Sequence, residues 1–360
     1  MSPQPQKAVL SIEPYKGGEA VLPGFANPIK LASNENPLGS SPRAQAAFKS
    51  AAEKLWLYPE GSAEKLRQAI GKRYGLDPAR IICGAGSDEI FWMLARAYLG
   101  DGDEIVQNEF AFSIYRIFAQ AAGAATKSGK DKNLTADVDS MLAQMGPKTR
   151  LVFLANPNNP TGTYMPFDEV RRLHAGLPPQ AVLVLDAAYA EFVRRNDYAA
   201  GIELVSESDN VIMTRTFSKI HGLAALRLGW AYAAPGIIDA LNRVRLPFNV
   251  NTPALLAGIA AIEDAEFQEA SADLNARELA RLENELTALG LGVAPSVANF
   301  TLARFPSGAK SAAAADAFLR ARGIIVRRME SYGLADCLRI SIGDEAQMSA
   351  LIAALRDFMK

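Results

Sequence analysis

One lysine, Lys219, stands in the apolar stretch TRTFSKIHGLAALRLGW (residues 214–230), with an arginine, Arg227, eight positions later. A lysine that follows an apolar strand can lose its charge by desolvation, and the neutral amine attacks carbonyl carbons to form a Schiff base. A lone lysine after a strand is more often an ordinary surface residue. The stretch therefore suggests carbonyl chemistry only where other groups support it.

Two other segments end in polar side chains that would suit a bound aromatic ring. In LVLDAAYAEF, Asp186 ends an apolar run and Tyr189 follows three residues later. Ligands bind at the carboxyl ends of strands in open α/β sheets, where an aspartate could keep a pyridine nitrogen protonated and make a pyridoxal ring an electron sink. The alternative is that Asp186 caps the segment that follows it. In NPNNPTG (residues 156–162), the prolines and the glycine fix a turn that can direct the Asn159 amide inward, although the motif alone predicts only a loop.

A third segment, CGAGSDEI (residues 83–90), combines a strand, glycines and the start of a helix. Backbone N–H groups and the helix dipole at such a junction bind phosphate, although a plain turn is the commoner meaning of a glycine pair. Arg227 could add a bidentate guanidinium, and Thr216 and Ser218 could add hydroxyls. Together these groups would hold a phosphorylated aldehyde whose carbonyl reacts with Lys219.

The elements expected to position these residues alternate along the chain. Short β-rich runs at residues 80–86, 103–110, 149–157, 181–190, 210–218 and 227–234 are mostly separated by helical patterns such as 87–100 and 166–177. This alternation predicts an α/β fold with a mostly parallel sheet covered by helices on both faces. After about residue 250, a long amphipathic helix (271–290), strands and a final helix opened by Asp344 and Gln347 predict a smaller α+β domain. We expect an N-terminal arm at 1–45 that packs with the small domain, a large cofactor-binding domain at 46–250 and a small domain at 251–360.

The composition excludes several classes of protein. The 360 residues carry 38 Lys and Arg against 39 Asp and Glu, so no overall basic charge attracts nucleic acid or an anionic membrane. The two cysteines, Cys83 and Cys337, are too far apart for a metal-binding motif, which predicts no metal site and a reducing compartment. The first residues lack the apolar run of a secretion signal, and no apolar window is long enough to span a membrane. We therefore expect a cytoplasmic protein.

The order of these motifs along nearly the whole chain resembles the pyridoxal-phosphate-dependent aminotransferases of fold type I, class I/II. Within that superfamily the chain is most similar to the histidinol-phosphate aminotransferases. The segments that carry this resemblance are PYKGG, LASNENPLG, LYPEG, SKIHGLAALRLGW and GIIVRRMESYGLADCLRISIG. The resemblance implies pyridoxal 5′-phosphate as the cofactor.

The resemblance also implies a role for each residue of the cofactor site. Lys219 would form the Schiff base with the cofactor, Asp186 would bind the pyridine nitrogen, and Tyr189 would bind the ring oxygen and belong to the catalytic set. Asn159 would share that ring oxygen, and Phe112, in FSIY, would stack on the ring face. The residues that would hold the cofactor phosphate are Gly86, Ser87, Asp88, Thr216, Ser218 and Arg227.

Two further implications concern the partner subunit and the substrate. Tyr58, in LYPEG, would reach the cofactor phosphate of the partner subunit, which implies a homodimer with shared active sites. The residues that would face the substrate are Tyr15, Asn34, Arg327 and Arg339. In this family the two arginines would bind a substrate phosphate, whereas in amino-acid transaminases they would bind an α-carboxylate.

Some positions depart from the family's common pattern. Phe112 stands where a tyrosine is frequent, so stacking is kept but a hydroxyl is lost. His221 follows the lysine where an apolar residue is usual, and we interpret it as a structural histidine, with a proton relay as the alternative. His174 fits a helix surface. Arg328 lies beside Arg327, and because neighbours on a strand point to opposite faces, only one of them should contact substrate.

The predicted activity is transamination of histidinol phosphate with 2-oxoglutarate, giving imidazole acetol phosphate and glutamate. The first alternative is an aromatic (Phe or Tyr) aminotransferase, and a less favoured one is a decarboxylase of a phosphorylated amino acid. A regulatory protein built on this fold would usually carry an extra DNA-binding module, for which the chain leaves no room. The retained Lys219, Asp186 and Arg227 also favour an enzyme.

Overall fold

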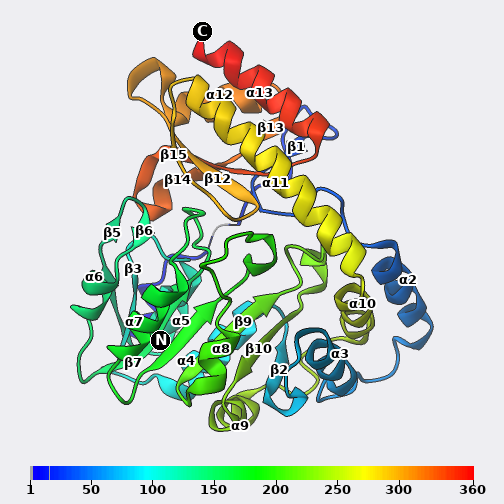
Figure 1. The fold of residues 1–360 in the computed structure, drawn as a ribbon, viewed down its shortest axis with the longest axis vertical. Coiled ribbons are helices and arrows are strands. Elements are labelled where there is room, and N and C mark those ends of the chain that lie inside the picture. Colours follow the sequence, from blue (N-terminus) through cyan, green and yellow to red (C-terminus); the bar gives the residue numbers. More distant parts are fainter. Residues whose placement is uncertain (1–2, 16) are drawn as a thin grey trace.

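The computed structural model describes residues 3–15 and 17–360; Lys16, within the PYKGG segment, lies outside the described residues. Figure 1 shows a larger unit built on a twisted sheet, with a smaller unit above it. The large sheet has seven strands in the order β2 (Ile81–Gly84), β10 (Gly229–Ala233), β9 (Val211–Thr216), β8 (Val182–Asp186), β7 (Thr149–Ala155), β3 (Glu104–Asn108) and β4 (Ala125–Gly129). Only β10 runs antiparallel to its neighbours. The predicted mostly parallel α/β sheet is confirmed.

Strict alternation along the strands builds a core on each face of this sheet. On β8, Leu183 and Leu185 belong to one buried cluster, whereas Val182 and Val184 belong to the other. The first face is covered by α3 (Glu64–Tyr74), α6 (Val138–Leu142), α7 (Phe167–Ala175), α8 (Ile202–Glu207) and α10 (Thr252–Glu263). The second face is covered by α4 (Ser87–Tyr98), α5 (Ile114–Ala121) and α9 (Pro235–Val244). Because side chains alternate with period two, apolar runs are required on strands that are buried on both sides.

The smaller unit is a four-stranded antiparallel sheet with helices packed on one face. Its strands lie in the order β11 (Gly292–Ala294), β12 (Phe300–Arg304), β15 (Leu334–Ser341) and β14 (Arg327–Met329). The helices are α11 (Ala265–Ala288), α12 (Ala312–Arg320) and α13 (Glu345–Met359), whose leucines fill the core beneath the sheet. Short strands complete the fold: β5 (Asp131–Lys132) pairs with β6 (Thr135–Ala136).

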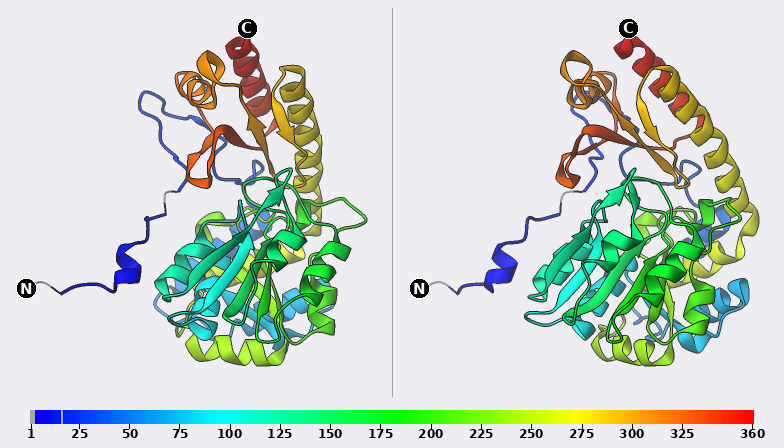
Figure 2. Two further views of the ribbon diagram at one scale, coloured as in Figure 1. Left: turned by 90° about the vertical axis from the view of Figure 1, so that its left-hand side faces the viewer. Right: turned by 60° about the vertical axis from the view of Figure 1, so that its left-hand side comes forward.

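The N-terminal segment contacts both units. After the short helix α1 (Lys7–Leu10), β1 (Ile29–Lys30) pairs in parallel with β13 (Ile324–Ile325) of the small unit, and Leu31 enters that unit's core. Near α1, Gln120 of α5 donates a hydrogen bond to Ser11 Oγ at 2.8 Å. Figure 2 shows the start of the chain projecting away from both units. Helix α2 (Pro42–Ser50) then packs against α10.

The two units share the long helix α11, which runs from the top of the molecule down to α10 (Figure 1). The apolar residues of α10 belong to the core of the large unit, although α10 falls within the predicted small domain. The division at residue 250 stays a prediction.

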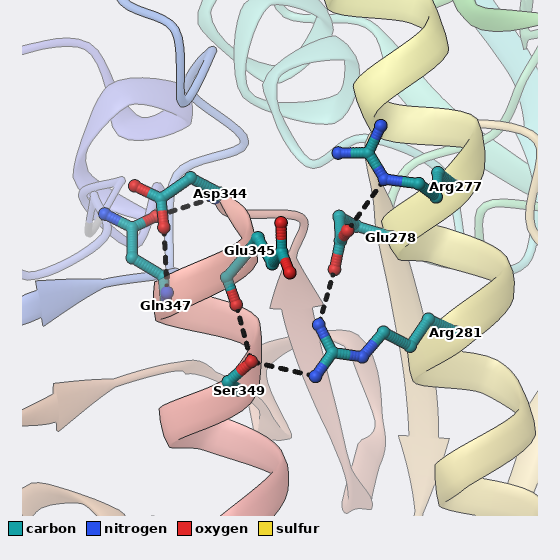
Figure 3. A network of polar contacts seen from close by, with 7 residues as sticks. All are labelled: Arg277, Glu278, Arg281, Asp344, Glu345, Gln347 and Ser349. Atoms are coloured by element: carbon teal, nitrogen blue, oxygen red, sulfur yellow. Dashed lines mark hydrogen bonds and ion pairs between the residues drawn. The ribbon is translucent and has the colours of Figure 1, made fainter.

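A polar network fixes α13 onto α11 (Figure 3). The carboxylate of Glu278, which is 2% exposed, accepts from Arg277 Nε and Arg281 Nη1, each at 3.1 Å, and Arg281 Nη2 donates to Ser349 Oγ on α13 at 2.8 Å. Asp344 and Gln347 form the predicted capping box at the start of α13. Since β15 leads directly into α13, this network also fixes the end of β15, which lies beside the site described next.

Candidate active site

A cavity of about 260 Å³ lies where the carboxyl ends of the large sheet's strands face the small unit. It is lined by Tyr15, Asn34, Ser87, Asp88, Phe112, Asn159, Asp186, Tyr189, Thr216, Ser218, Lys219, Arg227, Arg327 and Arg339, together with neighbouring residues. Gly86 lies directly beside it, with its backbone against the Arg227 guanidinium. Of the predicted site residues, only Tyr58 lies elsewhere.

Lys219 follows β9, and its amine is withdrawn from solvent. Nζ donates a hydrogen bond to the backbone oxygen of Ser33 in the N-terminal segment at 3.1 Å. Burial, and after it the positive charge of Arg339, lower the pKa of Lys219 to about 8. The neutral amine, which is the nucleophilic form, is therefore well populated near pH 8.

Asp186 ends β8, and its carboxylate accepts three hydrogen bonds. Oδ2 accepts from the Tyr115 hydroxyl at 2.5 Å, whereas Oδ1 accepts from Ala188 N at 3.2 Å and from Thr214 Oγ1 at 3.4 Å. Burial raises the pKa of Asp186 to about 6, and the hydrogen bond from Tyr115 opposes this rise. The bond from Ala188 N closes a local turn, but the N-cap of the following short helix (Ala190–Phe192) is Tyr189, so Asp186 does not cap that segment.

Arg339 joins the two units across the cavity. From β15 its Nη1 donates to Asn159 Oδ1 at 2.6 Å, and its Nη2 donates to Ala32 O at 2.8 Å. These bonds orient the Asn159 amide inward, as the turn NPNNPTG predicts. Burial lowers the pKa of Arg339, and its Nε has no hydrogen-bond partner among the described residues. An anion in the cavity would satisfy that group.

A second chain of hydrogen bonds holds the phenol of Tyr189. Asn34 Nδ2 donates to the Tyr189 hydroxyl at 3.0 Å, and Ser341 Oγ donates to Asn34 Oδ1 at 2.9 Å. Asn34 has the left-handed backbone angle φ 56°, which asparagine tolerates better than most residues. Burial raises the pKa of Tyr189, so its hydroxyl remains protonated and can act as a donor.

A cluster of donors at one end of the cavity has the chemistry of a phosphate site. Helix α4 begins here with the free backbone N–H groups of its first turn, after Gly86 at φ +82°. Arg227 Nη2 lies 3.1 Å from Asp88 Oδ2, and its Nη1 donates to the backbone oxygen of Ala224 at 3.1 Å. A Cβ at Gly86 would lie 2.7 Å from Arg227 Nη2, so only glycine leaves the guanidinium in this place. The hydroxyls of Thr216 and Ser218 line the same end.

The strand register separates the two neighbouring arginines. Arg327 pairs with Arg339 across β14 and β15, so both side chains point to the cavity face of the sheet. Arg327 Nη1 also donates to the backbone oxygen of Gly17. Arg328 instead forms an ion pair with Glu330 and does not line the cavity.

Aromatic rings close one side of the cavity. Phe112 lines it just before α5, and Tyr15 meets Phe112 edge to face, with ring centroids 6.3 Å apart. Phe112 could therefore cover one face of a flat ring.

Three other residues singled out in the sequence lie outside the cavity. Tyr58 is 82% exposed and stacks on Phe248, with centroids 4.7 Å apart. His221 is buried, its ring centroid is 4.7 Å from that of Phe217, and burial lowers its pKa to about 3, which agrees with a structural histidine. His174 bonds Asn210 at 2.8 Å.

Sequence reasoning missed four residues that shape the site: Tyr115, Ser33, Glu35 and Tyr332. Ser33 and Glu35 flank Asn34 in LASNENPLG, and Tyr332 lies in GIIVRRMESYGLADCLRISIG. These two segments could therefore have indicated all three residues. Tyr115 follows Phe112 by three residues, the spacing of neighbours on one helix face.

The donor set fits pyridoxal phosphate. Cationic, hydroxyl and amide groups gather at one end of the cavity for a phosphate, Asp186 can bind a pyridine nitrogen, and the Lys219 amine can react with an aldehyde. Within residues 3–15 and 17–360, no cluster of three or more His, Cys, Asp or Glu side chains could hold a metal ion.

Comparisons with known proteins agree with this site. The family model of aminotransferase class I and II matches residues 26–355, so the protein is a class I/II aminotransferase of fold type I and uses pyridoxal phosphate. The chain is 52% identical to the histidinol-phosphate aminotransferase of Rhodospirillum centenum over 99% of each chain, and 53% identical to that of Maricaulis maris over 100% of each. The crystal structure of histidinol-phosphate aminotransferase from Sinorhizobium meliloti in complex with pyridoxal-5′-phosphate superposes with a TM-score of 0.92 at 28% identity, covering 100% of this chain and 98% of that one. The chain belongs to the histidinol-phosphate aminotransferase family.

In the part of the chain that the structure describes, no helix is both long and apolar enough to cross a bilayer.

Proposed function

We propose that the enzyme transfers the amino group of histidinol phosphate to 2-oxoglutarate, giving imidazole acetol phosphate and glutamate in histidine biosynthesis. The observation that carries this proposal is the pair Arg327 and Arg339, which lie opposite each other on adjacent strands, line the same cavity as Lys219 and offer two guanidinium groups to one dianion. The activity named for the relatives at 52% and 53% identity supports the same donor and does not favour the aromatic alternative.

The cofactor would be held at its phosphate, its ring and its aldehyde. Arg227, Thr216, Ser218 and the first backbone N–H groups of α4 (Ser87 and Asp88), with Gly86 leaving room beside them, would bind the phosphate. Asn159 and Tyr189 would donate to the ring oxygen, and Phe112 would cover the ring face. Asp186, mostly ionised at neutral pH with a pKa of about 6, would pair with the ring nitrogen.

Pyridoxal phosphate, when bound, holds the donor's amino group and draws electrons from the carbon that carries it. Lys219 would hold the cofactor through its aldehyde, and its free amine would take up the proton of the carbon that carries the donor's amino group. Its pKa of about 8 suits this role because enough neutral amine exists near neutral pH. The hydrogen bond from Asn34 to the Tyr189 hydroxyl would keep that hydroxyl in place beside the cofactor ring.

The two substrates would use the same cationic site in turn. Arg339 and Arg327 would bind the phosphate of the first donor and then a carboxylate of 2-oxoglutarate, since both groups accept bidentate guanidinium bonds. Tyr15 would close over the bound molecule from the N-terminal segment.

We also propose that the enzyme is a cytoplasmic homodimer in which Tyr58 reaches the partner's cofactor phosphate. Tyr58 and Trp56 are 82% and 80% exposed. Both belong to a set of exposed apolar side chains, which we call the apolar patch: Leu55, Trp56, Leu57, Tyr58, Leu246 and Phe248. Exposed patches of this kind typically mark protein interfaces, and Tyr58 contacts nothing of the cavity in its own chain. Sedimentation equilibrium would test the dimer, and mixing Tyr58→Phe with Lys219→Ala subunits would test whether sites are shared.

The experiment that tests the substrate is a single-turnover absorbance measurement on the cofactor-loaded enzyme. Histidinol phosphate, phenylalanine and tyrosine are added in separate runs, with the Lys219→Ala variant as the control. We expect rapid conversion of the bound cofactor with histidinol phosphate alone. Faster conversion with the aromatic amino acids would move Arg339 to carboxylate binding and overturn the proposed substrate.

A further inference from the structure

Tyr115 is a buried residue beside the site whose hydroxyl the proposed mechanism does not use. It has no exposed surface and does not line the cavity. Its hydroxyl donates a hydrogen bond to Asp186 Oδ2 at 2.5 Å. The two other hydrogen bonds to Asp186 among the described residues both reach Oδ1, at 3.2 and 3.4 Å. Tyr115 therefore makes the shortest hydrogen bond to this carboxylate.

Packing fixes the position of the Tyr115 ring. It stacks on Phe153 of β7 with centroids 4.5 Å apart and planes 13° apart, and it meets Phe91 of α4 edge to face at 5.2 Å. Phe112 meets it at 5.7 Å and 90°. The residues at and just before the start of α5 therefore position both the Phe112 ring, which lines the cavity, and the Tyr115 hydroxyl, which donates to Asp186. A side chain fixed in this way donates its hydrogen bond without a further loss of freedom.

The charge on Asp186 depends on this donor. A buried carboxylate without hydrogen bonds takes up a proton, and each donor to its ionised form opposes this. Asp88 raises the pKa of Asp186 further because it adds a like charge. Tyr189 and Tyr198 also interact with Asp186 electrostatically, but the Tyr189 hydroxyl accepts from Asn34 and the Tyr198 hydroxyl donates to the backbone oxygen of Asn156. The Tyr115 hydroxyl accordingly holds the carboxylate in its ionised form.

We propose that Tyr115 is a positioning residue that keeps Asp186 ionised and directed at the ring nitrogen of the cofactor. The proposal rests on the proposed role of Asp186. It assigns a function to a second residue of FSIY: Phe112 lines the cavity, and Tyr115 acts on it through Asp186. The ring nitrogen would keep its proton because its counter-ion is held in place on two sides.

The test compares Tyr115→Phe, which keeps the stacked ring, with Tyr164→Phe. Tyr164 donates to Asp197 at 2.9 Å outside the cavity, so the control variant removes the same hydroxyl from the same kind of partner. Cofactor affinity is measured by equilibrium dialysis, and ring-nitrogen protonation is followed against pH by NMR of isotope-labelled cofactor. In Tyr115→Phe we expect the dissociation constant to rise by about tenfold to a hundredfold, the loss typical of one hydrogen bond to a charged group. The ring nitrogen should also lose its proton at lower pH, by about one unit for each factor of ten.

Unchanged affinity and unchanged protonation in a folded Tyr115→Phe enzyme would overturn the proposal. A double-mutant cycle with Asp186→Ala distinguishes positioning from packing, because Tyr115→Phe should have little further effect once the carboxylate is absent. An equal effect in both backgrounds would also contradict the proposal. If Tyr115→Phe does not fold, replacing Tyr115 by 3-fluorotyrosine keeps the ring and makes the hydroxyl a stronger donor, so the ring nitrogen should lose its proton at higher pH. A wild-type enzyme that binds no cofactor would instead refute the proposed function.

Discussion

Replacing Gly86 by alanine should have two separately measurable effects: a loss of folding stability from backbone strain, and a weaker affinity for the cofactor. The new Cβ would stand 2.7 Å from Arg227 Nη2 and 3.3 Å from its Cζ, and the backbone would remain at φ +82°. With ψ at 167° this backbone lies in a region that essentially only glycine populates, which costs another residue about 1–3 kcal/mol. Because the guanidinium ends a flexible side chain, Arg227 can swing away, which limits any further loss of folding stability but removes the guanidinium from the phosphate site. The loss of one charged hydrogen-bonding partner, about 1.5–3 kcal/mol, corresponds to a rise of about tenfold to 150-fold in the cofactor dissociation constant.

Gly102→Ala is the matched control. Gly102 has nearly the same backbone angle, φ +84°, and a Cβ there would meet no atom within 4 Å. Both variants should lose folding stability in chemical denaturation because each places a side chain at a positive φ, whereas only Gly86→Ala should bind pyridoxal phosphate more weakly in a fluorescence titration. Equal affinity of the two variants would refute the argument that Gly86 is required to make room for Arg227.

Three further predictions concern charge and positioning. The rate at which pyridoxal phosphate reacts with the cofactor-free enzyme should rise about tenfold per pH unit up to about pH 8 and then level, because the neutral amine reacts and the pKa of Lys219 is lowered to about 8. A rate, measured by stopped-flow absorbance, that continues to rise beyond pH 10 would contradict this. Arg215→Met should destabilise the fold by about 3–5 kcal/mol, because it leaves Glu191, its buried partner at 3.1 Å, unpaired; adding Glu191→Gln should recover part of that loss in urea unfolding. Ser341→Ala should raise KM more than it lowers kcat, since it frees Asn34 Oδ1 without touching Lys219, and steady-state kinetics with an unchanged KM would count against that role for Ser341.

The parts of the fold that the sequence predicted are those where one local pattern admits one structure. The run VLVLD predicts β8, buried on both faces, and the structure confirms it as Val182–Asp186. The edge strand β4, Ala125–Gly129, was missed because its sequence, ATKSG, is mostly exposed and carries no apolar alternation. The reversed direction of β10 could not be read either, since an antiparallel strand buried in the middle of a sheet has the same apolar composition as a parallel one.

In the candidate site too, the residues that a local sequence pattern marks were predicted, and those fixed by contacts distant in the sequence were not. Lys219 and Asp186 each stand at the end of a strand, and the fold brings such ends together. The choice between Arg327 and Arg328 required the register of β14 against β15, which no local pattern encodes. Tyr115 was missed because its partner, Asp186, lies 71 residues away along the chain.

The reactivity of Lys219 illustrates why such contacts decide function. Its apolar neighbours in the sequence predict desolvation, and burial is indeed the largest cause of its lowered pKa. The second cause is Arg339, which stands on β15 of the small unit, and the oxygen that accepts the amine's hydrogen bond belongs to Ser33 of the N-terminal segment. The small unit therefore helps to make the nucleophile of the large unit neutral through the charge of Arg339, whereas Ser33 of the N-terminal segment positions the amine. A change that separates the small unit from the large one should raise the pKa of Lys219 toward its ordinary value and slow its reaction with the cofactor, even if every residue of the large unit is unaltered.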